Sequence, residues 1–180
     1  MPLTMSQNSA EIIFERVGLD RIAEVLSVLD EAAAWLHARR ITQWSPQFDP
    51  AWVRGAITRG ETWLATIEGV AAGTLTLDWN DPLWADVDGP AGYVRRLAAR
   101  RTAPGLGALM LDWAAGAARE NGADFLRLDC VTSNIRLRTY YETRGFIHRG
   151  DAPVKTAPDQ RLLIGPTTWV SRYELDLTDQ

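Results

Sequence analysis

The chain has very few of the residues that build disulfide frameworks or metal sites. Its 180 residues include one cysteine, Cys130, and two histidines, His37 and His148. A single thiol excludes an internal disulfide, and so few nitrogen and sulfur ligands argue against a His/Cys metal centre. Cys130 falls on the inward face of an expected strand and is interpreted as a small core residue. We therefore expect a metal-free protein.

Long apolar runs and a basic leader are also missing. No segment approaches the roughly 18–20 apolar residues that span a bilayer, and the N-terminus lacks the basic and apolar segments of a secretory signal. Hydrophobic residues make up 46% of the chain and charged residues 23%, a balance typical of globular domains. We expect a cytoplasmic protein with no membrane partner, a flexible tail over residues 1–9 and one domain over residues 10–180.

The net charge of −4 disfavours general binding of nucleic acids, but the charge is unevenly distributed. Residues 95–149 hold ten arginines and five acidic residues, a local balance of +5, whereas the remainder carries −9. A basic middle in an acidic protein favours a compact anionic ligand, such as a phosphorylated cofactor. Two alternatives stay open: the arginines lie on solvated helix faces, or they bind DNA in a salt-dependent way.

The pattern of apolar residues predicts an α/β fold with a mixed sheet of six to seven strands and flanking helices. Strands are expected at 11–17, 62–67, 72–78, 93–99, 125–131, from 146 onward and at 170–177, and helices at 20–39, 50–58, 106–120 and 133–144. Asp49 is the expected N-cap of the second helix, with Pro50 at its first position. The early strands are linked by hairpins, whereas residues 93–131 form a β-α-β unit whose strands should be parallel.

The segment 100–110, RRTAPGLGALM, joins a strand to a helix. Gly105 and Gly107 let the backbone approach a ligand closely, and a helix start offers unpaired amides with a partial positive charge. Arg100 and Arg101 stand beside it. The segment is neither a P-loop nor a dinucleotide fingerprint. It indicates a phosphate site, although Gly105 could equally serve only to form the turn.

The second segment begins at Asn134 and ends at Gly145-Phe146. Asn134, Arg138 and Tyr141 are spaced i, i+4 and i+7, so an amide, a guanidinium and a phenol share one helix face. The alternative interpretation is that Asn134 only caps the helix and that Tyr141 packs in the core.

Together the two segments resemble the cofactor-binding core of the GNAT superfamily of acyl-CoA-dependent N-acyltransferases. The resemblance covers residues 93–148, and its most specific part is the pattern Asn-x6-Tyr-Glu-x2-Gly-Phe that starts at Asn134. It implies a GNAT-like fold in which backbone amides hold the pyrophosphate of coenzyme A; these belong to Gly105, Leu106, Gly107 and Ala108.

The same resemblance assigns further contacts to the cofactor. Backbone groups near Leu97 and Ala99 would pair with the pantetheine arm, which Asn134 would also bind. Arg100 and Arg138 are the candidate side chains for additional contacts. The chain departs from the family at two positions of the phosphate segment: Thr102 stands where Arg or Gln is usual, and Pro104 removes one amide donor.

The implied activity is N-acetyl transfer, in which an acetyl or other acyl group moves from acetyl-CoA to the amine of a small molecule or peptide. Tyr141 would protonate the leaving thiolate. No proton acceptor is assigned, because each of the candidates could be a surface or turn acid: Glu61, Asp78, Asp81 and Asp86.

A catalytically silent acyl-CoA sensor or interaction protein of the same fold is the alternative, and a homodimer is compatible with either activity. Trp44, Trp79 and Trp84 fall in or beside loops where the entrance to the substrate site is expected. They could stack on an acceptor or serve as buried anchors of those loops.

Overall fold

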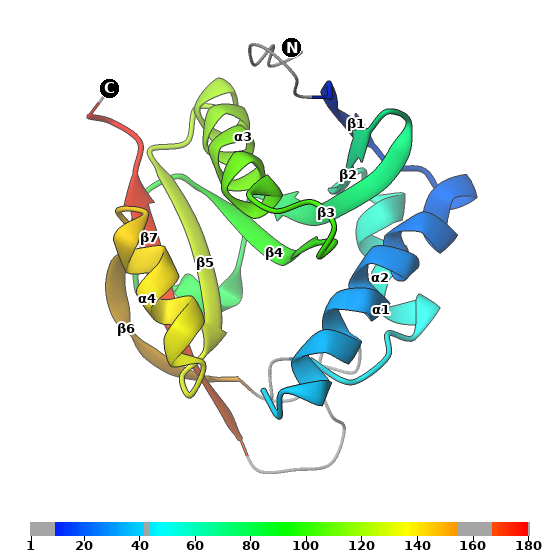
Figure 1. Cartoon of the computed structure of the whole chain (residues 1–180). Coiled ribbons are helices and arrows are strands. Elements are labelled where there is room, and N and C mark those ends of the chain that lie inside the picture. The colour runs from blue at the N-terminus through cyan, green and yellow to red at the C-terminus, as the bar shows by residue number, and fades with distance from the viewer. Residues whose placement is uncertain (1–9, 42–43, 155–166, 180) are drawn as a thin grey trace.

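The computed structural model describes residues 10–41, 44–154 and 167–179, and their strands form a seven-stranded mixed sheet in the order β1-β2-β3-β4-β5-β7-β6 (Figure 1). The strands are β1 Ile12–Arg16, β2 Thr62–Ile67, β3 Val70–Asp78, β4 Ala91–Ala99, β5 Phe125–Val131, β6 Ile147–Val154 and β7 Thr168–Asp176. The helices are α1 Ile22–Ala38, α2 Pro50–Thr58, α3 Leu106–Glu120 and α4 Ile135–Thr143, with short 3-10 turns η1 Leu19–Arg21 and η2 Pro82–Trp84. The predicted fold class and element order are confirmed. The predicted tail at residues 1–9 and most of the loop after β6 lie outside the described residues.

Local sequence signals set several of these boundaries. The Asp49 carboxylate accepts a hydrogen bond from the Ala51 amide at 2.8 Å and begins α2, as predicted. Glu68 and Gly69 have φ angles of 52° and 78°, which is the geometry of a two-residue hairpin turn with both central residues left-handed. Because this turn is so tight, β3 begins at Val70, two residues earlier than predicted.

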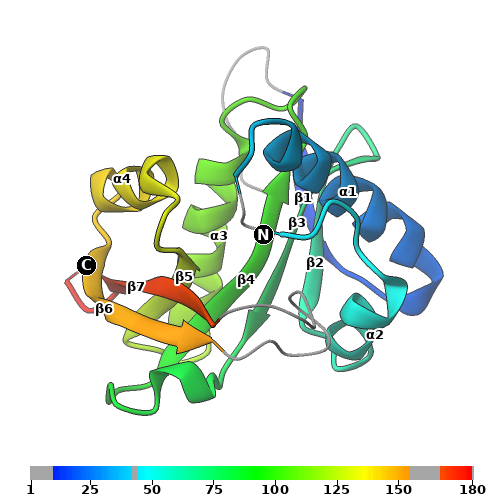
Figure 2. The ribbon, with the colours of Figure 1, turned by 90° about the horizontal axis from the view of Figure 1, so that it is seen from below.

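The helices cover the sheet in two layers. Helices α1 and α2 pack on one face of the β1–β4 half, whereas α3 and α4 lie on the opposite face (Figure 2). Helix α3 approaches β3 closely at Gly73, where a Cβ atom would lie 2.6 Å from the sulfur of Met110. The close approach therefore depends on glycine at this position. No helix in the described ranges is long and apolar enough to cross a membrane.

The parallel contact between β4 and β5 is short. Only Ala91–Tyr93 pair with Phe125–Arg127, and beyond these residues β4 pairs with β3 while β5 pairs with β7. The register between β3 and β4 shifts by one residue beside Arg96, whose φ is 50°. An extra residue of this kind bends and twists a strand. The bulge thus accompanies the divergence of β4 from β5, which is visible in Figure 1.

Candidate active site

A cavity of about 480 Å³ lies where β4 and β5 separate. Its walls come from the end of α1 and the segment after it, from Asp81 and Leu83, from the second half of β4, from β5, from α4 and from the end of β6. The lining includes Trp35, Trp44, Phe48, Asp81, Leu83, residues 94–99, Arg101, Leu128, Asn134, Tyr140 and Tyr141. Strand divergence thus brings residues from distant parts of the chain around one space.

The segment that contains Gly105 and Gly107 forms the first turn of α3 and leaves backbone amide donors free. Gly105, with a φ of 82°, is the N-cap, and the Leu106 amide donates to the Ala103 carbonyl oxygen at 3.2 Å. Among the described residues, the amides of Gly105, Gly107 and Ala108 have no hydrogen-bond partner. A Cβ atom at either glycine would meet no atom within 4 Å. Three of the four predicted amides are therefore open to a ligand, and the Leu106 amide is already engaged.

Two arginines predicted to contact the cofactor are bound elsewhere in the protein. Arg100 crosses β3, donating from Nε to the Ala71 carbonyl and from Nη2 to Ser27 Oγ, both at 2.8 Å. Arg138 donates from Nε to the Tyr173 hydroxyl at 3.1 Å, and it is not among the residues that line the cavity. Neither side chain is brought to the cavity or to the start of α3.

The predicted cofactor contacts on β4 do reach the cavity. Leu97 and Ala99 line it from the edge of β4 that β5 has left. Arg101 lines it too, with its guanidinium 4.1 Å from the ring centroid of Trp35. Arg101, rather than Arg100, is therefore the arginine of this pair that lies beside the cavity.

Helix α4 and its N-cap residue carry the predicted amide side chain, Asn134, and the predicted phenol, Tyr141. Asn134 caps the helix, its Oδ1 accepting from the Leu137 amide at 3.2 Å, and also lines the cavity. Tyr141 is only 5% exposed and packs against Phe146 and Tyr173, with ring centroids 5.7 and 5.8 Å away. It nevertheless lines the cavity. Asn134 and Tyr141 thus have the structural roles of the alternative interpretation, and both also line the cavity.

Burial determines the protonation state of the Tyr141 hydroxyl. Burial raises its pKa well above the ordinary value of a phenol, so the group stays protonated at neutral pH. Because Tyr141 lines the cavity, its hydroxyl can hydrogen-bond a ligand bound there.

One of the four candidate proton acceptors reaches the cavity. Asp81 lines it, with Oδ1 accepting from the Leu83 amide at 2.9 Å and Oδ2 lying 3.2 Å from Arg95 Nη2. Asp78 shares the same guanidinium at 3.4 Å. The other two acids are paired away from the cavity, Glu61 with Arg59 and Asp86 with Arg172.

Asp78 should make stability depend on pH. Burial raises its pKa to about 6, opposed by Arg95 and reinforced by Glu61 and Asp81. An unfolded aspartate titrates near ~3.9, so the folded state binds more protons between these values and stability falls as pH rises from about 4 to about 6. We expect Asp78→Asn to remove this loss, which is about 3 kcal/mol. Denaturant unfolding of both proteins from pH 4 to 7.5 measures it, and a difference that stays constant with pH would contradict it.

The aromatic residues of the loops divide into two groups. Trp44 lines the cavity together with Trp35 and Phe48, which the sequence analysis did not single out. Phe48 is held there by its amide, which donates to Asp30 of α1 at 2.8 Å, a contact that leaves no mark in the sequence. Trp84 is a buried anchor instead.

Cys130 is fully buried, and burial raises the pKa of its thiol to about 12. It therefore belongs to the core, as predicted, and is not a nucleophile.

Comparison with known proteins agrees with this architecture. Residues 26–146 match the Acetyltransferase (GNAT) family. The Bacillus subtilis N-acetyltransferase YesJ is 31% identical over 143 residues, which cover 70% of this chain and 76% of that protein. A GNAT-family acetyltransferase from Listeria monocytogenes superposes with a TM-score of 0.74 at 23% identity, covering 96% of this chain and 98% of the other.

A second solved structure, yncA from Salmonella typhimurium with its cofactor acetyl-CoA, has a TM-score of 0.65 at 13% identity and covers 94% of this chain and 95% of the other. At this identity the likeness shows the fold, and the family follows from the sequence matches. The chain, with its sheet opened between β4 and β5, belongs to the GNAT family of acetyltransferases.

Proposed function

We propose that the protein transfers an acetyl group from acetyl-CoA to the amine of a small molecule or peptide by direct attack on the thioester. The observation that carries the proposal is the cavity between β4 and β5, which has Tyr141 and Asn134 on its wall. The unpartnered amides at the start of α3, the helix that follows β4, supply a second feature that suits a phosphate.

The residues present fit an acyl-CoA. The amides of Gly105, Gly107 and Ala108, with the positive end of the α3 dipole, suit a pyrophosphate. The free edge of β4 at Leu97 and Ala99 can pair with an extended amide-containing arm, in the way that a peptide adds to a sheet edge.

The side chains at the cavity can then support the transfer. The amine nitrogen attacks the thioester carbonyl carbon, a C–N bond forms and the C–S bond breaks. A backbone amide of β4 would stabilise the oxyanion, and Tyr141 would give its proton to the leaving thiolate. The proton lost by the amine would pass to water or to Asp81, which is the acid of the four candidates that lines the cavity.

The acceptor end of the cavity favours an amine with an apolar or flat body. Trp35, Trp44 and Phe48 present aromatic surface there, and aromatic faces bind apolar groups and cations. Asp81 adds a carboxylate, paired with Arg95, to the same lining.

The proposal is tested by calorimetric titration with coenzyme A and by thiol release from acetyl-CoA over a panel of amines, including arylalkylamines, aliphatic diamines and short peptides. We expect binding and turnover on at least one arylalkylamine or diamine. Coenzyme A binding without turnover on any amine would support the silent sensor instead. Absence of binding would remove both functions.

A further inference from the structure

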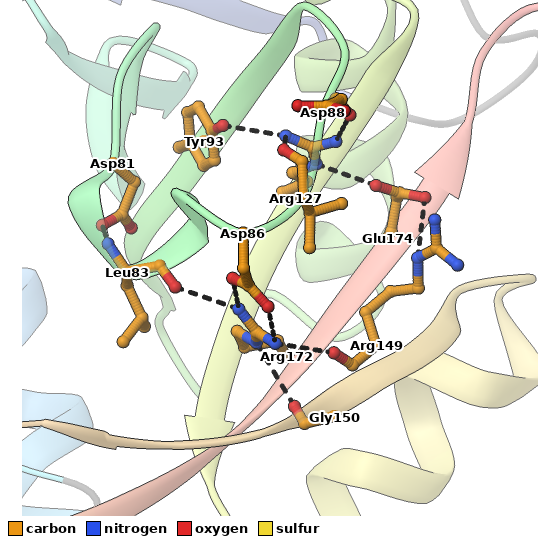
Figure 3. Close-up of polar contacts among 11 residues, drawn as sticks. Asp81, Leu83, Asp86, Asp88, Tyr93, Arg127, Arg149, Gly150, Arg172 and Glu174 are labelled. Carbon is orange, nitrogen blue, oxygen red and sulfur yellow. Dashed lines mark hydrogen bonds and ion pairs between the residues drawn. The ribbon is translucent and has the colours of Figure 1, made fainter.

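A buried arginine of β5 holds the segment between β3 and β4. Arg127 is 1% exposed and donates from Nε to Glu174 Oε2 of β7 at 2.8 Å (Figure 3). Its other nitrogens donate to the Tyr93 hydroxyl at 3.0 Å and to three backbone carbonyls of the segment, those of Val87, Asp88 and Gly89. One side chain therefore fixes the second half of the segment against the sheet.

A second arginine, on β7, holds the first half. Arg172 is 6% exposed, and its Nη1 donates to the Leu83 carbonyl at 3.0 Å and to Asp86 Oδ1 at 2.6 Å. Its Nη2 contacts the other Asp86 oxygen at 3.1 Å and the Arg149 carbonyl at 2.9 Å. Figure 3 shows both guanidiniums directed at the same stretch of backbone.

The indole of Trp84 lies near both arginines. Its ring centroid is 5.1 Å from the Arg127 guanidinium carbon and 5.2 Å from that of Arg172, and the residue is 2% exposed. Burying two guanidiniums is costly unless their N–H groups are paired. Here the pairing depends on one backbone conformation of residues 83–89, so the arginines specify that conformation.

The held segment reaches the acceptor end of the cavity. Leu83, whose carbonyl accepts from Arg172, lines the cavity, and so does Asp81, whose carboxylate accepts from the Leu83 amide. A shift of this backbone would move both side chains relative to the aromatic wall. The cofactor contacts expected along β4 and α4 lie elsewhere in the chain.

We propose that Arg127 and Arg172 are positioning residues for the acceptor amine, acting through the segment 81–89. The proposal rests on the acetyl-transfer function proposed above. It predicts that loosening the segment weakens binding of the amine and leaves binding of acetyl-CoA unaltered.

Two variants loosen the segment from opposite sides. Arg172→Met removes the anchor on β7, and Asp86→Ala removes its partner on the segment, where the carboxylate side chain is 65% exposed and its loss leaves no core cavity. If Arg172→Met does not fold, Asp86→Ala still tests the proposal. Arg119→Met is the control, because the Arg119 side chain donates to the Leu177 carbonyl at 3.4 Å, outside the segment and the partners of its two arginines.

Steady-state kinetics should show an amine KM about tenfold higher in both variants, with the KM for acetyl-CoA within about twofold of wild type. The control should keep both constants. Hydrogen–deuterium exchange of the amides of residues 81–89 should rise in the variants and not in the control, and this readout does not require activity.

Faster exchange with an unchanged amine KM, or unchanged exchange in both variants, overturns the positioning role. Equal rises in both KM values overturn it as well, because they indicate a general loss of structure. If wild type shows no turnover on any amine, the proposed function fails and the acceptor role fails with it, whereas an active wild type with unaffected variants refutes the positioning role alone.

Discussion

Replacing Tyr141 by phenylalanine is expected to lower kcat by about 100-fold while changing the KM for acetyl-CoA by less than about twofold. Proton transfer by a placed side chain contributes about 10²–10⁴-fold to a rate, and the phenylalanine ring keeps the contacts with Phe146 and Tyr173. Because burial keeps the Tyr141 phenol protonated, its loss removes a donor rather than a base. Steady-state thiol release measures both constants.

Tyr140→Phe is the matched control for this variant. Tyr140 is the preceding residue of α4 and also lines the cavity, so its substitution removes one phenol from the same wall without touching the proposed donor. We expect kcat within about threefold of wild type. Equal losses in the two variants, or no loss at Tyr141, would show that Tyr141 is not the proton donor.

Replacing Gly107 by aspartate is expected to weaken coenzyme A binding by at least about 100-fold without destabilising the protein. A Cβ atom at Gly107 meets nothing within 4 Å, so the folded chain accepts the side chain. A carboxylate in the first turn of a helix is favourable by about 0.3–1 kcal/mol. The same carboxylate would occupy the phosphate position and repel its charge. The substitution is thus expected to preserve or slightly raise the stability of the fold and to lower the affinity for coenzyme A.

Calorimetry with coenzyme A and thermal unfolding measure the two effects together. Gly116→Asp is the control, since Gly116 lies in the same helix and also has open space at its Cβ, far along the helix from its first turn. An unchanged affinity in Gly107→Asp would place the phosphates elsewhere. A lowered unfolding temperature in Gly107→Asp would mean that this glycine is required for the fold.

Sequence patterns predicted the helices and strands well where neighbouring residues define the start or end of the element. The Asp49-Pro50 pair gave the start of α2, and β5 was predicted with its observed ends, because an N-cap and a short apolar strand are each defined by adjacent residues. The bulge at Arg96 could not be predicted, since a left-handed arginine in a strand has no local signal. The opening of the sheet is therefore a product of tertiary structure.

The arginines of residues 95–149 show what the net charge of a segment does not predict. They were interpreted as anion-binding or solvated, yet Arg127 is fully buried against a loop and Arg100 binds to β3 and α1. A charge total records no information about which face of a strand a side chain occupies. The contacts of Arg127 come from Glu174 and from residues 87–89, distant in sequence, and no spacing rule connects them.

The strand order determines when β6 can join the sheet during synthesis. β7 lies between β5 and β6 and supplies pairing to both, so β6 has no place in the sheet until Thr168–Asp176 has left the ribosome. That late strand also carries Arg172, whose partners Leu83 and Asp86 lie 89 and 86 residues earlier in the chain, and Glu174, the partner of Arg127. The segment that carries Asp81 and Leu83 therefore gains its anchor at Arg172 only after β7 has been synthesised.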